Sequence, residues 1–368
     1  MDAGVPSAER RATADNSIRL PSSLRDRIGQ MVMVGFRGLT PREAEPTLRS
    51  IRNGEIGWVV LFDVDAETGG PRNIQSPEQL LELNQALKAA NPIPVMVTVD
   101  AEGGFYHRLK ERYGFAPTVP AATIGETNDL AFTYSAGLTT AGELARTAID
   151  MNISPVVDLL NPSNLMVSAR RRSFSADPHL VAAHAREIIR AHHELGVFTA
   201  IKHFPGMGGN LKPFAPGLGE IIQAWSSAEI VPYRELQAEG LIDSVLATRA
   251  THPQLDEANP GCLSPAIVDG LLRRDIGFDG VVMSDALEML PIWDVFGFER
   301  GIVKAIQAGC DVLMFCNQSG IVPYSDDRAP AAIDVVVEAI ERGEITEARI
   351  DKSCERILAL KARRAALG

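Results

Sequence analysis

Ionisable side chains follow three short apolar runs of this sequence, each at the point where the run ends. They are Asp100, the adjacent pair Lys202 and His203, and Asp285. Polar groups at the ends of buried strands are how α/β proteins build sites. Asp285 follows four residues that we expect inside the protein, so its carboxylate starts partly desolvated. Such a carboxylate can act as a nucleophile toward an anomeric carbon, whereas an equally weighted alternative is an aspartate that caps the next helix.

Two arginines extend this set of polar groups. Arg108 lies behind the segment that Asp100 opens, and Arg172 lies in a loop after a fourth apolar run. Together with Asp100, Lys202 and His203 they are short-range hydrogen-bonding groups of the kind that hold vicinal hydroxyls. A buried ion-pair network that ties loops together is the alternative, and both roles are compatible.

Eight apolar, mostly β-branched runs are predicted as strands, and helical segments separate most of them. Continuous apolar character favours a parallel sheet that is covered on its outer face. The predicted strands are Met31–Val34, Trp58–Phe62, Val95–Val99, Ile153–Val157, Thr199–His203, Ser244–Ala247, Val281–Ser284 and Val312–Phe315. This number predicts an α/β fold, a (β/α)8 TIM-type barrel. A doubly wound sheet is the alternative, but it usually has fewer strands and a nucleotide fingerprint.

The prediction of helices is clearest where an apolar face is accompanied by residues typical of helix ends. Pro178–Leu195 has an apolar face and ends before Gly196, and Ser264 is predicted to cap a helix that begins at Pro265. Two further helices are expected at 330–342 and 347–365. Without a linker-like change of composition, we expect one catalytic domain over 23–368 after a disordered lead-in at 1–22.

The amino-acid composition argues against some classes of binding partner. The net charge is −11 over 368 residues, which argues against nucleic acid or an anionic membrane surface. No apolar run approaches the length of a membrane span, and residues 1–20 lack the apolar core of a signal peptide. The four cysteines show no paired metal spacing and are expected as buried free thiols in a cytoplasmic protein. They are Cys262, Cys310, Cys316 and Cys354.

Three further motifs are weak. The glycines from Gly206 to Gly209 lack the helix of a dinucleotide site. The acidic turn from Asp63 to Glu67 has Thr68 where a calcium loop needs glycine. We expect that turn to be solvated. Four histidines on the 178–195 helix lack a metal-binding arrangement and are expected at the surface: His179, His184, His192 and His193. No metal or other cofactor is predicted.

The sequence resembles glycoside hydrolase family 3, in particular its single-domain β-N-acetylhexosaminidase branch, from about Leu24 to Leu360. The segments that carry the resemblance are Ile28–Phe36, Val99–Gly104 with Arg108 behind it, Ser154–Asp158, Arg172–Pro178, Ile201–Gly206, Gly277–Asp285 and Ala308–Asp311. The combination of Lys-His-Phe-Pro-Gly with Gly-Phe-Asp-Gly-Val-Val-Met-Ser-Asp is specific.

The resemblance implies a TIM-type barrel and retaining hydrolysis of a small β-linked carbohydrate, with Asp285 as the nucleophile. N-acetylglucosamine is the first expectation for the sugar and glucose the second. The residues implied to bind the sugar are Asp100, Arg108, Arg172, Lys202 and His203.

The acid/base loop departs from the family pattern. Met207 stands for a usual His, and Pro213-Phe214-Ala215 stands for Asp-Ser-His, so the expected proton shuttle is missing. In addition, Phe105 replaces a common Arg, and Arg249 stands where His is frequent.

Four explanations remain open for the missing shuttle. Another residue substitutes, with His107, Lys212, Glu220 and Glu288 as candidates by position. A neighbouring subunit of a homo-oligomer supplies the donor. The reaction is altered, as in transglycosylation. Or the protein is a sugar-binding pseudoenzyme.

Overall fold

Eight short parallel strands form the central sheet of the computed structural model, which describes residues 19–215, 219–318, 320 and 322–367. Their order in the sheet is β11-β8-β5-β4-β3-β2-β1-β12. A parallel bridge between Met283 and Val312 joins the two end strands, so the sheet closes into a barrel. The strands are β1 (Val32–Gly35), β2 (Trp58–Leu61), β3 (Met96–Val99), β4 (Met151–Asn152), β5 (Phe198–Phe204), β8 (Ser244–Ala247), β11 (Val281–Ser284) and β12 (Leu313–Phe315). The predicted (β/α)8 barrel is confirmed, and the doubly wound alternative is wrong.

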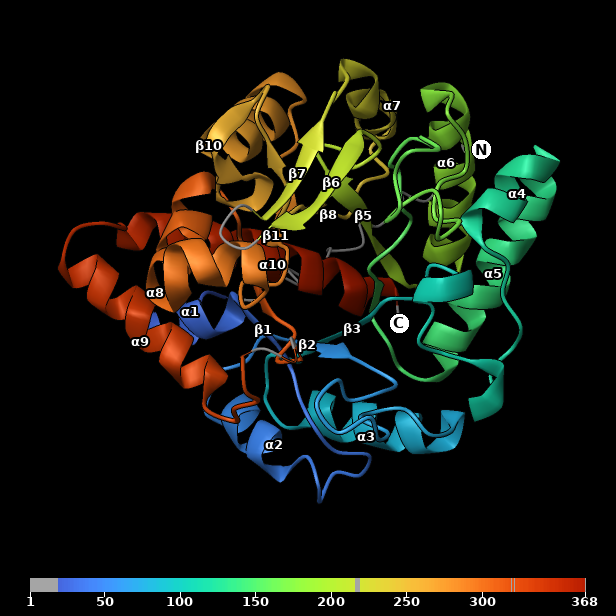
Figure 1. The fold of residues 1–368 in the computed structure, drawn as a ribbon. Coiled ribbons are helices and arrows are strands. Elements are labelled where there is room, and N and C mark those ends of the chain that lie inside the picture. Colours follow the sequence, from blue (N-terminus) through green and yellow to red (C-terminus); the bar gives the residue numbers. More distant parts are fainter. Residues whose placement is uncertain (1–18, 216–218, 319, 321, 368) are drawn as a thin grey trace, which may run out of the picture.

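Helices surround this barrel (Figure 1). They are α1 (Leu24–Gln30), α2 (Glu45–Arg52), α3 (Pro77–Ala89), α4 (Ala121–Thr127), α5 (Leu130–Arg146), α6 (Pro178–Glu194), α7 (Val231–Ala238), α8 (Leu290–Ala308), α9 (Arg328–Glu341) and α10 (Glu347–Leu367). A further helical segment with wide turns, Ala266–Asp275, precedes β11. It begins one residue after Pro265, and the Ser264 hydroxyl accepts a hydrogen bond from the Ile267 amide, as the cap prediction requires.

Local sequence explains the ends of the helix that leads to the site. The Asp177 carboxylate accepts the His179 amide at the start of α6, and Pro178 occupies the first helical position. Gly196 then takes φ +67°, a conformation that favours glycine, just beyond the helix. Val181 and Ala185 lie on its buried face. The chain is thereby turned directly into β5, the strand that carries Lys202 and His203.

The fourth strand was predicted at Ile153–Val157 but lies at Met151–Asn152. The reason is Pro155, which has no amide hydrogen and so interrupts the ladder. Contact with β5 resumes beyond it, where the Val157 amide donates to the Lys202 carbonyl at 2.8 Å.

The predicted loop after His203 is largely a second sheet. β6 (Asn210–Ala215) and β7 (Gly219–Gln223) pair antiparallel, and β7 continues to β9 (Thr251–His252) and β10 (Asp256–Pro260). In Figure 1 the yellow-green strands β6 and β7 run side by side between α7 and β10, and β10 belongs to the same sheet. Among the described residues, the acid/base loop that the resemblance implies is therefore a loop here only in the short segment between Pro205 and Gly209.

Two predictions about surface polarity are wrong for part of their residues, although Glu67 and His179 are exposed as predicted. Asp63 and Asp65 are buried rather than solvated, because Lys110 pairs with Asp63 at 2.6 Å and Arg72 with Asp65 at 2.8 Å. His184 and His192 are also buried. Each has a polar partner that offsets its burial, the Thr133 hydroxyl at 2.8 Å for His184 and the Ile188 carbonyl at 2.8 Å for His192.

The described part of the chain offers no helix that is both long and apolar enough to traverse a bilayer. All four cysteines are free, and three of them are buried, whereas Cys316 is partly exposed. Most of the predicted lead-in, residues 1–18, lies outside the described residues.

Candidate active site

A pocket of about 280 Å³ opens where the barrel strands end at their carboxyl termini. All six residues predicted from the sequence line it: Asp100, Arg108, Arg172, Lys202, His203 and Asp285. They come from positions up to 185 residues apart in the chain, 285 minus 100. Parallel strands bring them together because their carboxyl ends share one rim of the barrel.

Lys202 is the centre of a buried charge cluster on one side of this pocket. Its Nζ lies 2.6 Å from Asp100 Oδ1 and 2.6 Å from Glu102 Oε1. Glu102 also accepts two hydrogen bonds from Arg172, both at 2.8 Å. The cluster therefore alternates anions and cations, and it presents donors and acceptors to the pocket in fixed directions.

Glu102 was not singled out in the sequence, although it lines the pocket and its side chain is only 4% exposed. Burial alone would raise the pKa of Glu102, but the adjacent Arg172 and Lys202 cations outweigh burial and hold that pKa below its ordinary value. Its position two residues after Asp100, in Asp-Ala-Glu, was the available signal. Successive side chains point to opposite faces only within a strand. This segment has already left β3, so both carboxylates reach Lys202.

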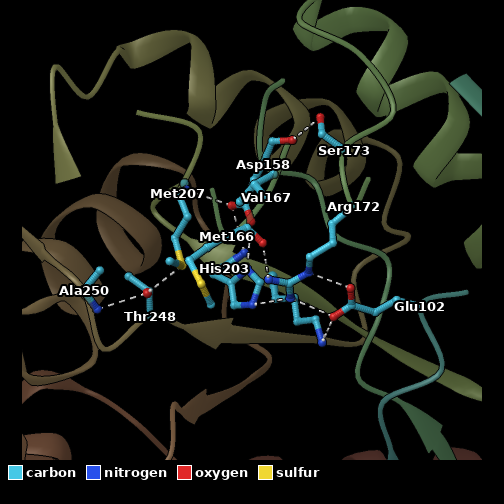
Figure 2. Close-up of polar contacts among 12 residues, drawn as sticks. Glu102, Asp158, Met166, Val167, Arg172, Ser173, His203, Met207, Thr248 and Ala250 are labelled. Atoms are coloured by element: carbon cyan, nitrogen blue, oxygen red, sulfur yellow. Dashed lines mark hydrogen bonds and ion pairs between the residues drawn. The ribbon is translucent and has the colours of Figure 1, made fainter. Parts of the chain in front are cut away.

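His203 is oriented by a carboxylate behind it (Figure 2). Its Nδ1 lies 2.7 Å from Asp158 Oδ2, and its Nε2 lies 3.2 Å from an Arg172 nitrogen. Arginine only donates, so Nε2 accepts and Nδ1 carries the proton that goes to Asp158. Burial opposes ionisation of Asp158, but His203 and the amides of His203 and Met207 hold its pKa below its ordinary value. Asp158 is thus a second residue that sequence reasoning left without a role.

Asp285 occupies the other side of the pocket. Arg249 Nη1 lies 3.2 Å from both carboxylate oxygens, and the amides of Arg249 and Ala286 donate to them at 3.2 and 2.8 Å. Burial would raise the pKa of Asp285, but the Arg249 cation, His203 and these amides together lower it. The group is therefore an anion, which a carboxylate nucleophile must be.

Arg249 in turn contacts a second carboxylate, because its Nη2 lies 2.9 Å from Glu220 Oε1 on β7. One guanidinium thus bridges Asp285 and Glu220. Glu220 Oε2 is buried without a hydrogen-bond partner. Glu220 itself, a described residue, does not line the pocket, since Arg249 stands on the pocket side.

The segment that follows His203 is tied down instead of free. The Met207 amide donates to Asp158 at 2.8 Å, and the Met207 sulfur lies 3.2 Å from the Thr248 hydroxyl, as Figure 2 shows. Met207 packs in a small core with Val167, Ile222 and Ala250. Its neighbours are held as well, since Trp225 donates to the Pro205 carbonyl at 3.0 Å. The position where the family usually carries the first histidine of this loop is here a packed contact.

Three of the four candidates for a substitute donor, His107, Glu220 and Glu288, do not line the pocket. Burial lowers the pKa of His107 to about 4 and raises that of Glu288 to about 7, yet neither side chain lines the pocket. Glu220 is engaged by Arg249, and the Lys212 side chain lies outside the described residues. Among the described lining residues, His203 is the one histidine, and the carboxylates are Asp100, Glu102 and Asp285.

Metal chemistry finds no support in the arrangement of side chains. Within the described ranges, no three or more His, Cys, Asp or Glu side chains are grouped so as to hold a metal ion. The polar groups of the pocket instead pair with one another or face its interior.

Comparison with known protein families and structures agrees with this geometry. The model of the family described as "Glycosyl hydrolase family 3 N terminal domain" matches residues 23–360. A beta-hexosaminidase from Xylella fastidiosa (strain M23) is 30% identical over 294 residues, which are 78% of this chain and 83% of that protein. A second beta-hexosaminidase, from Stenotrophomonas maltophilia (strain K279a), is also 30% identical with the same coverage.

Solved structures give the same result. A family 3 β-N-acetylglucosaminidase from Paenibacillus sp. FPU-7 superposes with a TM-score of 0.82 at 32% identity, over 94% of this chain. The chain spans 63% of the length of that protein. A β-N-acetylhexosaminidase from Beutenbergia cavernae has a TM-score of 0.77 at 27% identity and is covered over 99% of its length.

Proposed function

The chain belongs to glycoside hydrolase family 3, and from this premise we propose that it is a retaining β-glycosidase with Asp285 as its nucleophile. The observation that carries the proposal is an ionised, buried Asp285 in the same pocket as a preformed cluster of sugar-binding groups. In a double displacement the carboxylate attacks the anomeric carbon and forms a glycosyl ester, which water then opens.

The charge cluster around Lys202 is proposed to bind the sugar next to the scissile bond. Asp100 and Lys202 are paired at 2.6 Å and line the pocket, as do Arg108 and Arg172, so their outer hydrogen-bonding positions are available to hydroxyl groups. His203 is held by Asp158 in one orientation, which restricts the sugar further. Fixed partners of this kind lower the cost of ordering the site when substrate binds.

N-acetylglucosamine is our first proposal for the sugar, and glucose is the second. The first is supported by the names of the relatives, which are beta-hexosaminidases and β-N-acetylglucosaminidases. Loops around a barrel set the substrate, and the altered segment from Met207 onward keeps glucose as the alternative.

A sugar-binding protein without turnover is the second candidate function. The replacement of the family's Asp-Ser-His by Pro213-Phe214-Ala215 favours it, because none of these side chains can transfer a proton. Met207, in the place of a usual His, contacts the Thr248 hydroxyl instead. General acid/base catalysis typically contributes about 10²–10⁴-fold. An enzyme without it retains the nucleophilic part of the mechanism and is slow on poor leaving groups.

Turnover of an aryl β-N-acetylglucosaminide and an aryl β-glucoside tests the proposal, with Asp285→Ala as the control. A first-formed sugar product of β configuration, followed by proton NMR, is expected for retention. Sugar binding by calorimetry with no turnover of either aryl substrate would establish the second candidate. Turnover that survives Asp285→Ala would reject the assignment of the nucleophile.

A further inference from the structure

The side chains that line the pocket fall into two chemically different groups. The charged groups Asp100, Glu102, Arg172 and Lys202 come from β3, β5 and the loops beside them. Elsewhere the lining is rich in sulfur: Met166, Met207, Met289, Met314 and Cys316. Thioethers are apolar and polarizable, adapt to irregular surfaces and favour contact with aromatic rings. These sulfur-containing side chains offer few hydrogen bonds to a second sugar unit.

An aromatic edge lies beside Met166, because Arg172 contacts both the Met166 carbonyl and the Tyr106 ring. Tyr106 lines the pocket, and Arg172 lies over its ring at 4.4 Å. The Phe105 ring contacts the Tyr106 ring edge to face at 4.9 Å, and Arg170 lies over Phe105 at 4.3 Å. Phe105 is 62% exposed, which is high for so large an apolar side chain. An exposed ring beside a pocket lining is a surface on which a flat apolar group can stack.

At the positions where the family carries its acid/base loop, this sequence has no side chain that can transfer a proton to an alkoxide leaving group. Met207 stands for the first His and Pro213-Phe214-Ala215 for Asp-Ser-His. Arg249 faces Asp285 with a guanidinium that does not give up its proton. A leaving group that departs without protonation must be a weak base. Phenols, with a pKa of about 10 as in tyrosine, meet this condition far better than sugar or alkyl hydroxyls.

We propose, resting on the retaining glycosidase function above, that the natural substrates are β-glycosides of aromatic alcohols. The aromatic aglycone packs against the side chains of Met166 and Met207 and against the rings of Phe105 and Tyr106. Asp285 attacks the anomeric carbon, and the bond to the aryl oxygen breaks with its electron pair, so that a phenolate leaves and takes a proton from water. Water then attacks the anomeric carbon, the ester electron pair returns to Asp285, and the released proton neutralises the hydroxide.

The wild-type enzyme provides the first test. A series of substituted phenyl β-glycosides of the preferred sugar is compared with the methyl glycoside and with a β-linked disaccharide. We expect kcat/KM to fall steeply as the phenol pKa rises, with a burst of phenolate because the second step has no general base. Methyl glycoside or disaccharide cleaved within about tenfold of the phenyl glycoside would overturn the inference.

A variant series tests the binding surface. Phe105→Ala is expected to raise KM for phenyl glycosides about 2- to 10-fold, the range of one aromatic contact, while KM for the methyl glycoside is unchanged. Phe132→Ala is the matched control, because Phe132 lies on α5 and is 38% exposed. An unchanged KM in Phe105→Ala would reject the aromatic edge as a binding surface. Absence of any burst or turnover in the wild type would instead reject the glycosidase function itself, so the two failures are distinguishable.

Discussion

Arg249 and Asp285 form a close ion pair in which one guanidinium nitrogen lies 3.2 Å from both oxygens of the carboxylate. The same guanidinium holds Glu220 from the neighbouring hairpin at 2.9 Å. The family resemblance led us to note Arg249 only as a departure, a residue in place of histidine. In the structure it is the main cation that opposes the effect of burial on Asp285.

Removal of this cation is predicted to change the pH profile. In Arg249→Met the pKa of Asp285 rises, because burial is no longer opposed by the guanidinium. Activity requires the ionised carboxylate, so the acidic limb of kcat/KM against pH moves to higher pH. Arg249→Lys, which keeps the charge, is the control and is expected to shift less. An acidic limb at the wild-type position in Arg249→Met would contradict the prediction.

Removal of the nucleophile is predicted to abolish most activity with little effect on folding. Asp285→Asn keeps the shape of the side chain and is expected to lower kcat on an aryl glycoside by at least about 10³-fold. Mass spectrometry of wild-type enzyme incubated with a slow fluorinated glycoside is expected to locate the sugar ester on Asp285. An ester on another carboxylate would contradict the assignment.

Glu102 is predicted to matter for stability as well as for sugar binding. Glu102→Gln leaves Lys202 and Arg172 with less compensation in a buried place, at a cost of about 3–5 kcal/mol in the free energy of unfolding. Urea denaturation measures this cost. Glu126→Gln is the control, since Glu126 pairs with Arg171 at the exposed surface and little change is expected.

The same group gives a pH test with a defined sign. The folded-state pKa of Glu102 lies below its unfolded value of about 4.3. Its contribution to stability is therefore complete above pH 4.3 and is lost as the pH falls through the folded-state pKa. The difference in stability between wild type and Glu102→Gln is expected to shrink below about pH 4. A difference that stays constant from pH 7 to pH 3 would contradict this linkage.

For Glu288, the dependence of folding stability on pH has the opposite sign. Burial raises its pKa to about 7, and its Oε2 has no hydrogen-bond partner. The folded state therefore holds a proton that the unfolded state has lost between about pH 4.3 and 7, and stability falls across this window as pH rises. Glu288→Gln is expected to be more stable than wild type at pH 8 and similar to it near pH 4. Equal stability at both pH values would show that Glu288 is not protonated in the folded protein.

The barrel and the six predicted pocket residues could be read from the sequence because their signals are local. Asp100, Lys202 and Asp285 each follow an apolar run, and parallel strands place such positions on one rim. Arg108 and Arg172 lie in segments that follow such runs, and the resemblance to the family implies that they bind the sugar.

Other features depend on contacts between distant segments, and for these local patterns failed. The sequence around Asp63 is typical of a solvated turn, and only the structure shows that Lys110 pairs with this residue. The sequence around His184 likewise predicts a surface residue, and only the structure shows its buried partner, Thr133. The pairing of β6 with β7 was missed because Gly and Pro in the sequence favour a loop, whereas β7 also pairs with the distant strand β9. Glu102 was missed because its charge partners are 70 and 100 residues away, at Arg172 and Lys202.

Met207 stands where the family usually has a histidine, and its packing limits which residue can replace it. Its side chain fills a small core formed with Val167, Ile222 and Ala250, and its amide holds Asp158. A histidine placed there alone would bury an imidazole among apolar side chains, at a cost in stability. The family's loop also has Asp-Ser-His where this sequence has Pro213-Phe214-Ala215. No single substitution therefore restores the family's loop.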